Sequence, residues 1–522
     1  MKYIFFNLKT SVLALGIMCT TGCDKFKDFG DTNIDPYGSV SPINSALLTD
    51  AELLIGNILV GGTQTGVTSS LYAQQISETQ YTEASLYSEP KFEYSLTYRD
   101  ILANFQVIIN RNTNEKTKEA SLAYGSNANQ IAVAKILQTY IFWQLTDCWG
   151  DVPYSQALQG SAFVTPAYDK QEEIYPKLIS TLKDAVAKFD NGLVVKGDVF
   201  YNGNIAKWKK LANTLQLLIS LRMIKASPAA AQAAFTQAYN HVAGYITSNG
   251  DNLVINYPGD GTYNNPWYNI YDGRTDYALS KTFSDILTNM GDSRKTVFGS
   301  SATAFPYGLK RQDAENFSSA NTNYARVMAI NFRQKNAPFV FVNAASSLLA
   351  VSEAAVRGWI PGATTAKDAY DNAVKASFEQ WGLSLADANS LLGNAGNFAS
   401  GIGGGNNIGA NSFNSVTGQH ASTTSFLQRI FLQRYIAHFP DGIQVWSEWR
   451  RSCDLAQPNP VTGLAGIPAL VPTAFATNSS KGIPRRYVYG TNEYSTNGAN
   501  VAVAAGRLSG GDVLNARIWW DK

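Results

Sequence analysis

Aromatic and polar side chains alternate in residues 251–275, and this mixture is typical of surfaces that bind carbohydrate. Sugar rings expose C–H faces that stack on indole and phenol rings, while their hydroxyls need amide, carboxylate or guanidinium partners. One short run supplies both kinds of group: Asn264, Asn265, Trp267, Tyr268, Tyr271, Asp272 and Arg274. The same rings could instead pin the loop to the body of the protein, so the sequence leaves a ligand-binding and a structural role open.

A second aromatic group follows a predicted helix and consists of Gln80, Tyr81, Tyr87 and Tyr94. Here too the rings suit either a ligand or a hydrophobic core. Taken together, the two groups give a predicted ligand-binding set: Asn265, Trp267, Tyr268, Tyr271, Asp272, Arg274, Tyr81 and Tyr87.

Patterns that carry catalysis are missing from the sequence. The three histidines, His241, His420 and His438, have no metal-ligand spacing, and neither a nucleophile elbow nor a phosphate-binding glycine loop occurs. A glycosidase needs only two carboxylates at a set separation, but nothing singles out a pair among the 40 acidic residues. The sequence therefore predicts a protein that is not an enzyme, with no catalytic residues, no cofactor and no metal motif. Loops rich in Asp and Asn could still hold a structural Ca²⁺ through oxygen ligands.

The N-terminus resembles a bacterial lipoprotein signal. Two lysines, Lys2 and Lys9, flank the start, an apolar run covers residues 11–18, and small residues lead to Cys23. The apolar run is too short to span a bilayer and is typical of a secretory signal. We expect residues 1–22 to be a signal peptide and Cys23 to be acylated, which would anchor the chain in the outer membrane. An ordinary signal peptide cleaved nearby, or a buried N-terminal helix, are the alternatives.

Composition excludes some partners. The chain has 522 residues and a formal net charge of +2, and removal of residues 1–22 leaves equal numbers of basic and acidic side chains. Such a balance provides no electrostatic footprint for nucleic acid. With 45% hydrophobic and 16% charged residues, the chain can bury a large core and is not disordered.

Hydrophobic spacing predicts a mainly α-helical fold. Apolar residues recur with a helical period around residues 133–141, 174–189 and 208–222. Further helices are expected in segments that share this pattern: 45–60, 70–84, 97–112, 228–247, 275–289, 344–357, 366–381 and 424–438. Pairs of such helices joined by short loops favour hairpins stacked as in tetratricopeptide arrays.

Long loop-rich stretches interrupt this helical body. We expect a single domain over residues 23–522, with loop-rich insertions around 251–340 and 390–420 and a loop-rich C-terminal segment at 454–522. Segments this rich in Gly, Asn, Pro and Thr lie at the surface, and loops this long are usually functional or disordered. They would form an irregular subdomain beside the hairpins.

Several motifs, spread from end to end of the chain, resemble those of the SusD/RagB family of outer-membrane lipoproteins of Bacteroidetes. The match is closest to the SusD-like group described as starch-binding and outer-membrane-associated. The segments that carry it are Asp28–Pro36, Thr146–Tyr154, Arg274–Ser280, Gly291–Arg294, Glu353–Trp359, Gln433–Gly442, Trp446–Arg451, Pro484–Arg486, Asn492–Tyr494 and Trp519–Asp521. We interpret these motifs as marks of the fold and not as ligand contacts.

The resemblance implies a function as well as a fold. It implies tetratricopeptide-like hairpins in a surface lipoprotein of the outer membrane, acting as a lid on a SusC-like TonB-dependent transporter. Such a protein would capture a nutrient, most often an oligosaccharide, and deliver it without chemistry of its own. The alternatives are peptide capture, as in a RagB-like import protein, a secreted glycoside hydrolase, and a helical scaffold that has no ligand of its own and assembles only with partners.

Overall fold

A computed structural model of the chain describes residues 42–56, 59–60, 65–360, 363–393, 413–414, 419–420, 423–452 and 467–522. Residues Asn44–Lys522 form one compact unit, which contains all the elements discussed below. The predicted signal peptide at 1–22 and the predicted lipid site at Cys23 lie outside the described residues, as do most of the 390–420 insertion and residues 454–466.

Helices dominate the described residues, as the sequence predicts. The α-helices are α2 (Asn44–Gly56), α3 (Thr65–Tyr72), α4 (Ala103–Thr113), α5 (Lys118–Ser121), α6 (Asn127–Trp149), α7 (Gln171–Lys188), α8 (Ile205–Arg222), α9 (Pro228–Tyr239), α10 (Pro266–Tyr271), α11 (Lys281–Met290), α12 (Lys295–Phe298), α13 (Arg311–Ala320), α14 (Ala344–Val356), α15 (Ala363–Gln380), α16 (Leu385–Gly393), α18 (Thr423–Ala437), α19 (Gly442–Arg451) and α20 (Thr491–Gly506). Short tight or wide helical turns are η3 (Thr97–Leu102), η4 (Leu122–Tyr124), η5 (Gly160–Ala162), η6 (Asn249–Asp251) and η7 (Ile330–Phe332).

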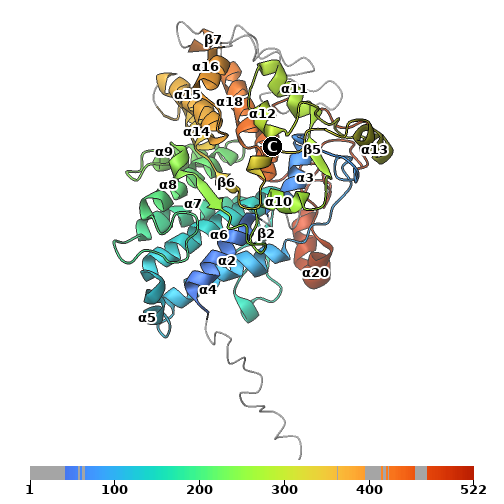
Figure 1. Cartoon of the computed structure of the whole chain (residues 1–522). Coiled ribbons are helices and arrows are strands. Elements are labelled where there is room, and N and C mark those ends of the chain that lie inside the picture. Colours follow the sequence, from blue (N-terminus) through green and yellow to red (C-terminus); the bar gives the residue numbers. More distant parts are fainter. Residues whose placement is uncertain are drawn as a thin grey trace, which may run out of the picture. The chain divides into compact units, whose positions relative to one another are not determined.

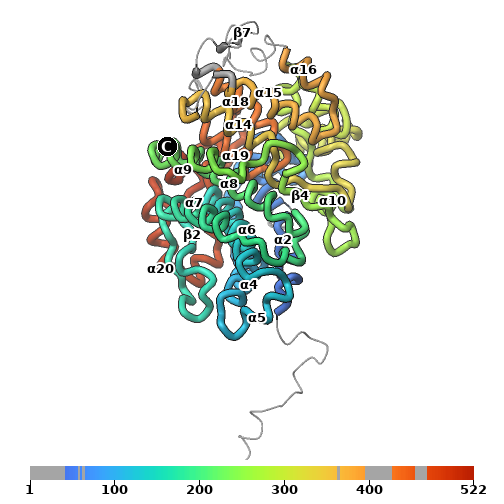
Figure 2. The backbone as a smooth tube through the Cα atoms, turned by 90° about the vertical axis from the view of Figure 1, so that its left-hand side faces the viewer, coloured from blue at the N-terminus to red at the C-terminus, as the bar shows by residue number. Residues whose placement is uncertain are grey.

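Neighbouring helices pack in pairs. Helices α6 and α7, α8 and α9, and α14 and α15 are such pairs, and α7 also packs on α8 (Figures 1 and 2). In α7 the buried face consists of Ile174, Leu178, Leu182 and Ala185, which recur at three- and four-residue intervals. Ser126 caps α6 by accepting a hydrogen bond from the Asn129 amide. The predicted mainly α fold built of helical hairpins is therefore confirmed. None of the helices in the described ranges is long and apolar enough to cross a bilayer.

Three predicted helices differ from the structure. The helix predicted over 70–84 is wrong, because Gln74 has a positive φ of 56° and the chain leaves α3 to become strand β1 (Ile76–Glu78). The segment 275–289 begins as strand β5 (Tyr277–Leu279) and becomes helical only at Lys281, and the helix predicted over 228–247 stops at Tyr239. Helix α20 lies within the C-terminal segment that the sequence predicts to be loop-rich. Its many Asn, Gly and Thr residues hide the helical period.

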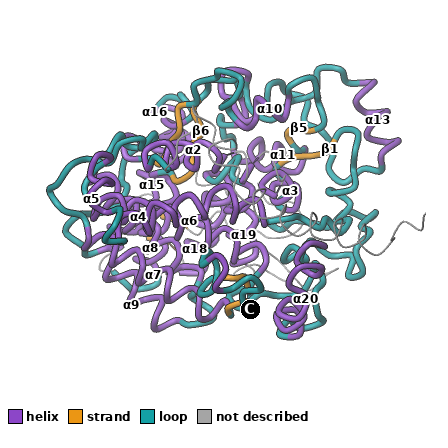
Figure 3. Tube along the Cα trace, turned by 90° about the horizontal axis from the view of Figure 1, so that it is seen from below, coloured by secondary structure: helices purple, strands orange, loops and turns teal. Residues whose placement is uncertain are grey.

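Strands occur only as two-stranded antiparallel pairs in the described part of the chain. The pairs are β1 (Ile76–Glu78) with β5 (Tyr277–Leu279), β2 (Val152–Pro153) with β3 (Tyr168–Asp169), β4 (Leu253–Asn256) with β6 (Pro338–Val342), and β7 (Phe413–Asn414) with β8 (Gln419–His420). The first pair joins segments about two hundred residues apart, with Glu78 opposite Tyr277. It lies near α3, α10 and α13 (Figure 3).

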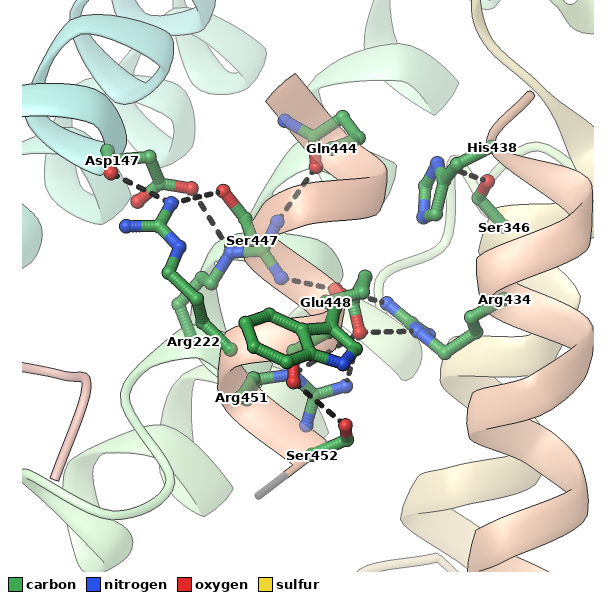
Figure 4. A network of polar contacts seen from close by, with 12 residues as sticks. Asp147, Arg222, Ser346, Arg434, His438, Gln444, Ser447, Glu448, Arg451 and Ser452 are labelled. Carbon is green, nitrogen blue, oxygen red and sulfur yellow. Dashed lines mark hydrogen bonds and ion pairs between the residues drawn. The ribbon is translucent and has the colours of Figure 1, made fainter. Parts of the chain in front are cut away.

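A network of buried charges crosses the helical core (Figure 4). Glu448 on α19 accepts hydrogen bonds from Arg434 of α18 at 2.8 and 3.0 Å and from Arg451 at 2.7 Å, and it also pairs with Arg222 of α8. Arg451 reaches on to both carboxylate oxygens of Glu353 on α14, at 2.7 Å each. Arg222 also donates to Asp147 of α6 at 3.0 Å. Five helices thus meet through charged side chains that water does not reach.

The neighbouring arginines lower the pKa values of these acids and keep them ionised. Burial alone would raise the pKa of Glu448, but the guanidinium groups of Arg434, Arg451 and Arg222 lower it well below its ordinary value. The same balance lowers the pKa of Glu353 to about 2, through Arg451 and Arg357. Because these pKa values lie below those of the unfolded chain, the stabilisation is present above the ordinary carboxylate pKa and is lost as the pH falls toward about 2.

The network predicts a large effect of one amide substitution. Glu448→Gln keeps the size of the side chain but leaves three buried guanidinium groups short of a negative charge. We expect the free energy of unfolding to fall by about 3–5 kcal/mol, measured by urea denaturation. The control is Glu315→Gln, which removes an exposed pair with Arg311 and should change stability by less than about 1 kcal/mol. Equal effects of the two substitutions would contradict a structural role of the network.

Candidate functional site

A cleft of about 630 Å³ lies beside the β1–β5 pair. One wall comes from α3, the end of β1 and the turns that follow it, and the other from α10 and the segment that leads into β5. The pairing of Glu78 with Tyr277 holds the two walls together. The two aromatic groups that the sequence singles out, around residues 80–94 and 264–274, therefore meet at a common site.

Glu78 is the most enclosed acidic group of the cleft, with 7% of its surface exposed. Its Oε2 atom accepts hydrogen bonds from the backbone amide and the hydroxyl of Ser85, at 2.9 and 2.7 Å. Burial raises the pKa of Glu78 to about 7, although the hydrogen bonds from Ser85 oppose this shift. At neutral pH the side chain can therefore act either as a hydrogen-bond donor or as an acceptor.

Tyr81 is the exposed aromatic residue of the cleft, with 46% of its surface accessible. The guanidinium carbons of Arg274 and Arg311 lie 5.8 and 5.0 Å from the centre of its ring. Arg274 in turn donates to Asp276 at 2.6 Å. The site thus presents a partly open phenol ring next to a fixed pair of opposite charges, which is the combination that stacks a sugar and binds its hydroxyls.

Asn265 and Trp267, at the start of α10, are fully buried, and this corrects their assignment to the predicted ligand residues. Trp267 has no exposed surface, so its indole packs in the core and no ligand face remains. Asn265, also fully buried, caps α10 by accepting from the Trp267 amide at 2.9 Å and donates to the Ala337 carbonyl at 3.1 Å. The polar–aromatic run therefore begins as a helix start that anchors the loop.

Tyr87 and Tyr271 are also engaged in structure. Tyr87 is fully buried and lies edge-on against Tyr72 at 6.0 Å, which corrects its assignment to the ligand set. Tyr271 is half-buried, and its hydroxyl accepts from the Val327 amide and donates to the Tyr277 carbonyl, both at 2.8 Å. Burial raises the pKa of both tyrosines above the ordinary value. Their rings hold the two walls in place.

The remaining predicted residues divide between cleft and surroundings. Arg274 lines the cleft together with Tyr81. Tyr268 is half-buried and Asp272 is exposed, and neither lines the cleft. In the chain they lie on either side of the lining residues Asn269 and Ile270. Of the eight predicted residues, the structure thus brings Tyr81 and Arg274 together.

Several lining residues were missed by reasoning from the sequence: Glu78, Glu83, Phe92, Asn269, Asp276 and Tyr277. A signal for two of them exists in the motif Arg274-Thr-Asp-Tyr277, which we interpret above as a mark of the fold only. The structure places its Arg, Asp and Tyr side chains along the cleft. Nothing in the sequence signals Glu78, because its segment is predicted to be helical.

Other candidate sites are less well equipped. Within the described ranges no group of three or more His, Cys, Asp or Glu side chains is arranged to hold a metal ion. A second groove of about 620 Å³ lies between α11, residues 306–309 and residues 468–475. Its exposed ring is Phe475, which has the Lys310 ammonium 4.7 Å from its centre. Unlike the cleft, this groove contains none of the predicted ligand residues.

Comparisons with known proteins agree with the fold. The family model SusD-like_2, described as starch-binding and associating with the outer membrane, matches residues 38–490. A solved chitin-binding protein superposes with a TM-score of 0.72 at 26% identity, covering 92% of this chain and 100% of its own. A chitin-binding SusD homolog from Flavobacterium johnsoniae gives 0.73 at 24%, covering 92% and 98%. A SusD homolog from Bacteroides uniformis gives 0.70 at 23%, covering 92% and 100%. No curated protein matches the chain.

The different burial of Trp267 and Tyr81 predicts a large loss of stability for one alanine substitution and a small loss for the other. Trp267→Ala should lower the free energy of unfolding by about 3–5 kcal/mol, because it leaves a large cavity in the core. Tyr81→Ala removes a half-exposed ring and should cost less than about 1 kcal/mol. Thermal and urea denaturation of both variants measure this. A Trp267→Ala protein as stable as the wild type would contradict the buried placement of the indole.

Proposed function

We propose that the cleft captures an oligosaccharide at the cell surface, because this chain belongs to the SusD-like family. That family is described as starch-binding and associating with the outer membrane. The observation that carries the proposal is the meeting of Tyr81 and Arg274 in one cleft of about 630 Å³. The volume fits a few sugar units, since ligand pockets of this size enclose small molecules. The ring, the amide of Asn269 and the Arg274–Asp276 pair offer the mixed surface that sugars need.

Relatives support a glycan as the ligand. Two of the structural relatives bear the description chitin-binding, and one of these shares 26% of its sequence with this chain over nearly its whole length. The ligand of the present chain is expected to belong to the same broad class of polysaccharide or oligosaccharide. The side chains that touch it would come from the loops around the cleft, since loops in general vary more among relatives than the elements they connect.

Delivery would need a partner in the membrane. We place the protein at the outer membrane, tethered through acylated Cys23, where it would hand its ligand to a SusC-like TonB-dependent transporter. The family description of association with the outer membrane supports this location. The helical body would serve as a rigid support for the cleft, and the energy for uptake would come from the transporter and not from this chain.

In this proposal the protein binds its ligand and catalyses no reaction. Glu78 has the raised pKa that a general acid also needs, so hydrolysis must be tested directly. Incubation of the purified protein with starch, chitin and other glycans, followed by analysis of released sugars, measures this. We expect no turnover, and a released product would favour the glycoside hydrolase alternative. Binding of peptides in place of glycans would favour the RagB-like alternative.

One tyrosine offers a test of the cleft. Tyr81→Ala should lower the affinity for the glycan that the wild type binds by about two- to tenfold, since a stacking ring contributes about 0.5–1.5 kcal/mol beyond its buried area. Calorimetry against a panel of oligosaccharides measures the affinity.

The matched control is Tyr494→Ala, which removes a tyrosine of nearly equal exposure, 43% against 46%, that does not line the cleft. It should leave the affinity unchanged. An equal loss in both variants, or in neither, would remove the cleft from the binding site.

A further inference from the structure

We infer that the cleft selects a glycan that carries protonated amino groups, such as a glucosamine oligomer, because it pairs an ammonium with the carboxylates of Glu78 and Glu83. This inference rests on the proposed function and names the class of ligand for the same site.

The lining of the cleft has an excess of negative charge. Three carboxylates line it, those of Glu78, Glu83 and Asp276, against one guanidinium, that of Arg274. Arg274 is already paired with Asp276 at 2.5 Å. In the described part of the chain neither Glu78 nor Glu83 forms an ion pair, so two acidic side chains face the cleft without a cation.

Glu78 is the more informative of these two acids. It is more than nine-tenths buried, its Oε2 accepts hydrogen bonds from Ser85, and the Ala84 backbone contributes a further hydrogen bond, but among the described residues no cation pairs with it. Besides burial, which is the main cause, the charge of Glu83 raises the pKa of Glu78, so the two carboxylates repel each other. A cation between them would remove this repulsion.

Other charged groups around the cleft do not supply that cation. Arg311 of α13 lies near Tyr81 and interacts electrostatically with Glu83, but its ion pair is with Glu315 at 2.9 Å. The tyrosines that feel the charge of Glu78, namely Tyr72, Tyr277 and Tyr307, have raised pKa values and remain neutral near pH 7. The residues that α3 and α10 contribute to the lining, Val67, Thr68, Asn269 and Ile270, carry no charge. The net field in the cleft is therefore set by Glu78 and Glu83.

An amino sugar fits this site better than a neutral sugar or a basic peptide. Its ring can rest on the open part of Tyr81, while its ammonium donates three hydrogen bonds to carboxylates close by. A neutral sugar leaves the two acids without a partner, and a lysine side chain brings the charge without a ring face for Tyr81. Only a ligand that carries both a positive charge and a sugar ring can contact the carboxylates and Tyr81 at the same time.

Two oligomers with the same backbone test this selection on the mature full-length protein. We expect the glucosamine hexamer to bind at least about tenfold more tightly than the N-acetylglucosamine hexamer near pH 7 in low salt, measured by calorimetry. Raised salt should shrink the difference, because the pairing is electrostatic. At acid pH, where the sugar amines are all protonated and Glu78 takes up a proton, affinity for the glucosamine hexamer should fall, whereas affinity for the acetylated hexamer should not change.

Two variants assign the preference to residues. Glu78→Gln and Glu83→Gln should each reduce the preference for the glucosamine hexamer several-fold and leave the acetylated hexamer nearly unaffected. Glu83 is exposed, so its variant is expected to fold even if the buried Glu78→Gln does not. Glu119→Gln, an exposed acid on α5 away from the cleft, is the matched control and should change neither affinity.

The outcomes separate this inference from the proposed function. Equal affinity for the two hexamers, or a preference that survives both cleft variants, overturns the selection of amines and leaves glycan capture standing. Tighter binding of a lysine-rich peptide than of the glucosamine hexamer also overturns it, in favour of a basic peptide. Failure of every glycan in the panel overturns the inference together with the proposed function.

Discussion

The fold depends on one buried carboxylate, Glu448, which holds three arginines from three helices. Arg222 comes from α8, Arg434 from α18 and Arg451 from α19 itself, and Arg451 extends the contact to Glu353 on α14. Removal of these charges from water is costly, and the cost is offset only when the geometry is good and each group is hydrogen-bonded. The helices can therefore pack only in an arrangement that brings these side chains together, which gives the core a defined registry.

Two close contacts at α3 connect this core to the cleft. Gly442, at the start of α19, lies so near α3 that an added Cβ would come within 1.9 Å of the Gly66 carbonyl oxygen. The next residues of α3 are fixed as well, since Ser69 shares a hydrogen bond of 2.7 Å with Tyr487. Helix α3 leads directly into β1, whose pairing with β5 sets the width of the cleft. The position of Glu78 and Arg274 is thus a consequence of core packing, and it does not depend on the loops alone.

The sequence predicts the helical body but only part of the site. Helices such as α7 and α8 have a strong apolar period, and local spacing suffices to predict them. The sequence predicts a helix where β1 lies, because the strand that pairs with β1 is about two hundred residues away and no local pattern indicates such a pairing. The residue type of Trp267 predicts a ring that could stack on a sugar. Its burial, which residue type does not reveal, keeps a ligand from reaching the ring. The residue types of Tyr81 and Arg274 are enough to predict their place in the site. The place of Glu78 in the site follows only from the tertiary structure.

The most direct test of the account is a crystal structure of the mature protein with a bound oligosaccharide chosen from the calorimetric panel. The account predicts sugar density in the cleft between the turns after β1 and the segment before β5, with a ring against Tyr81 and polar contacts to Arg274 or Glu78. Sugar density in the second groove beside Phe475, with the cleft empty, would contradict it.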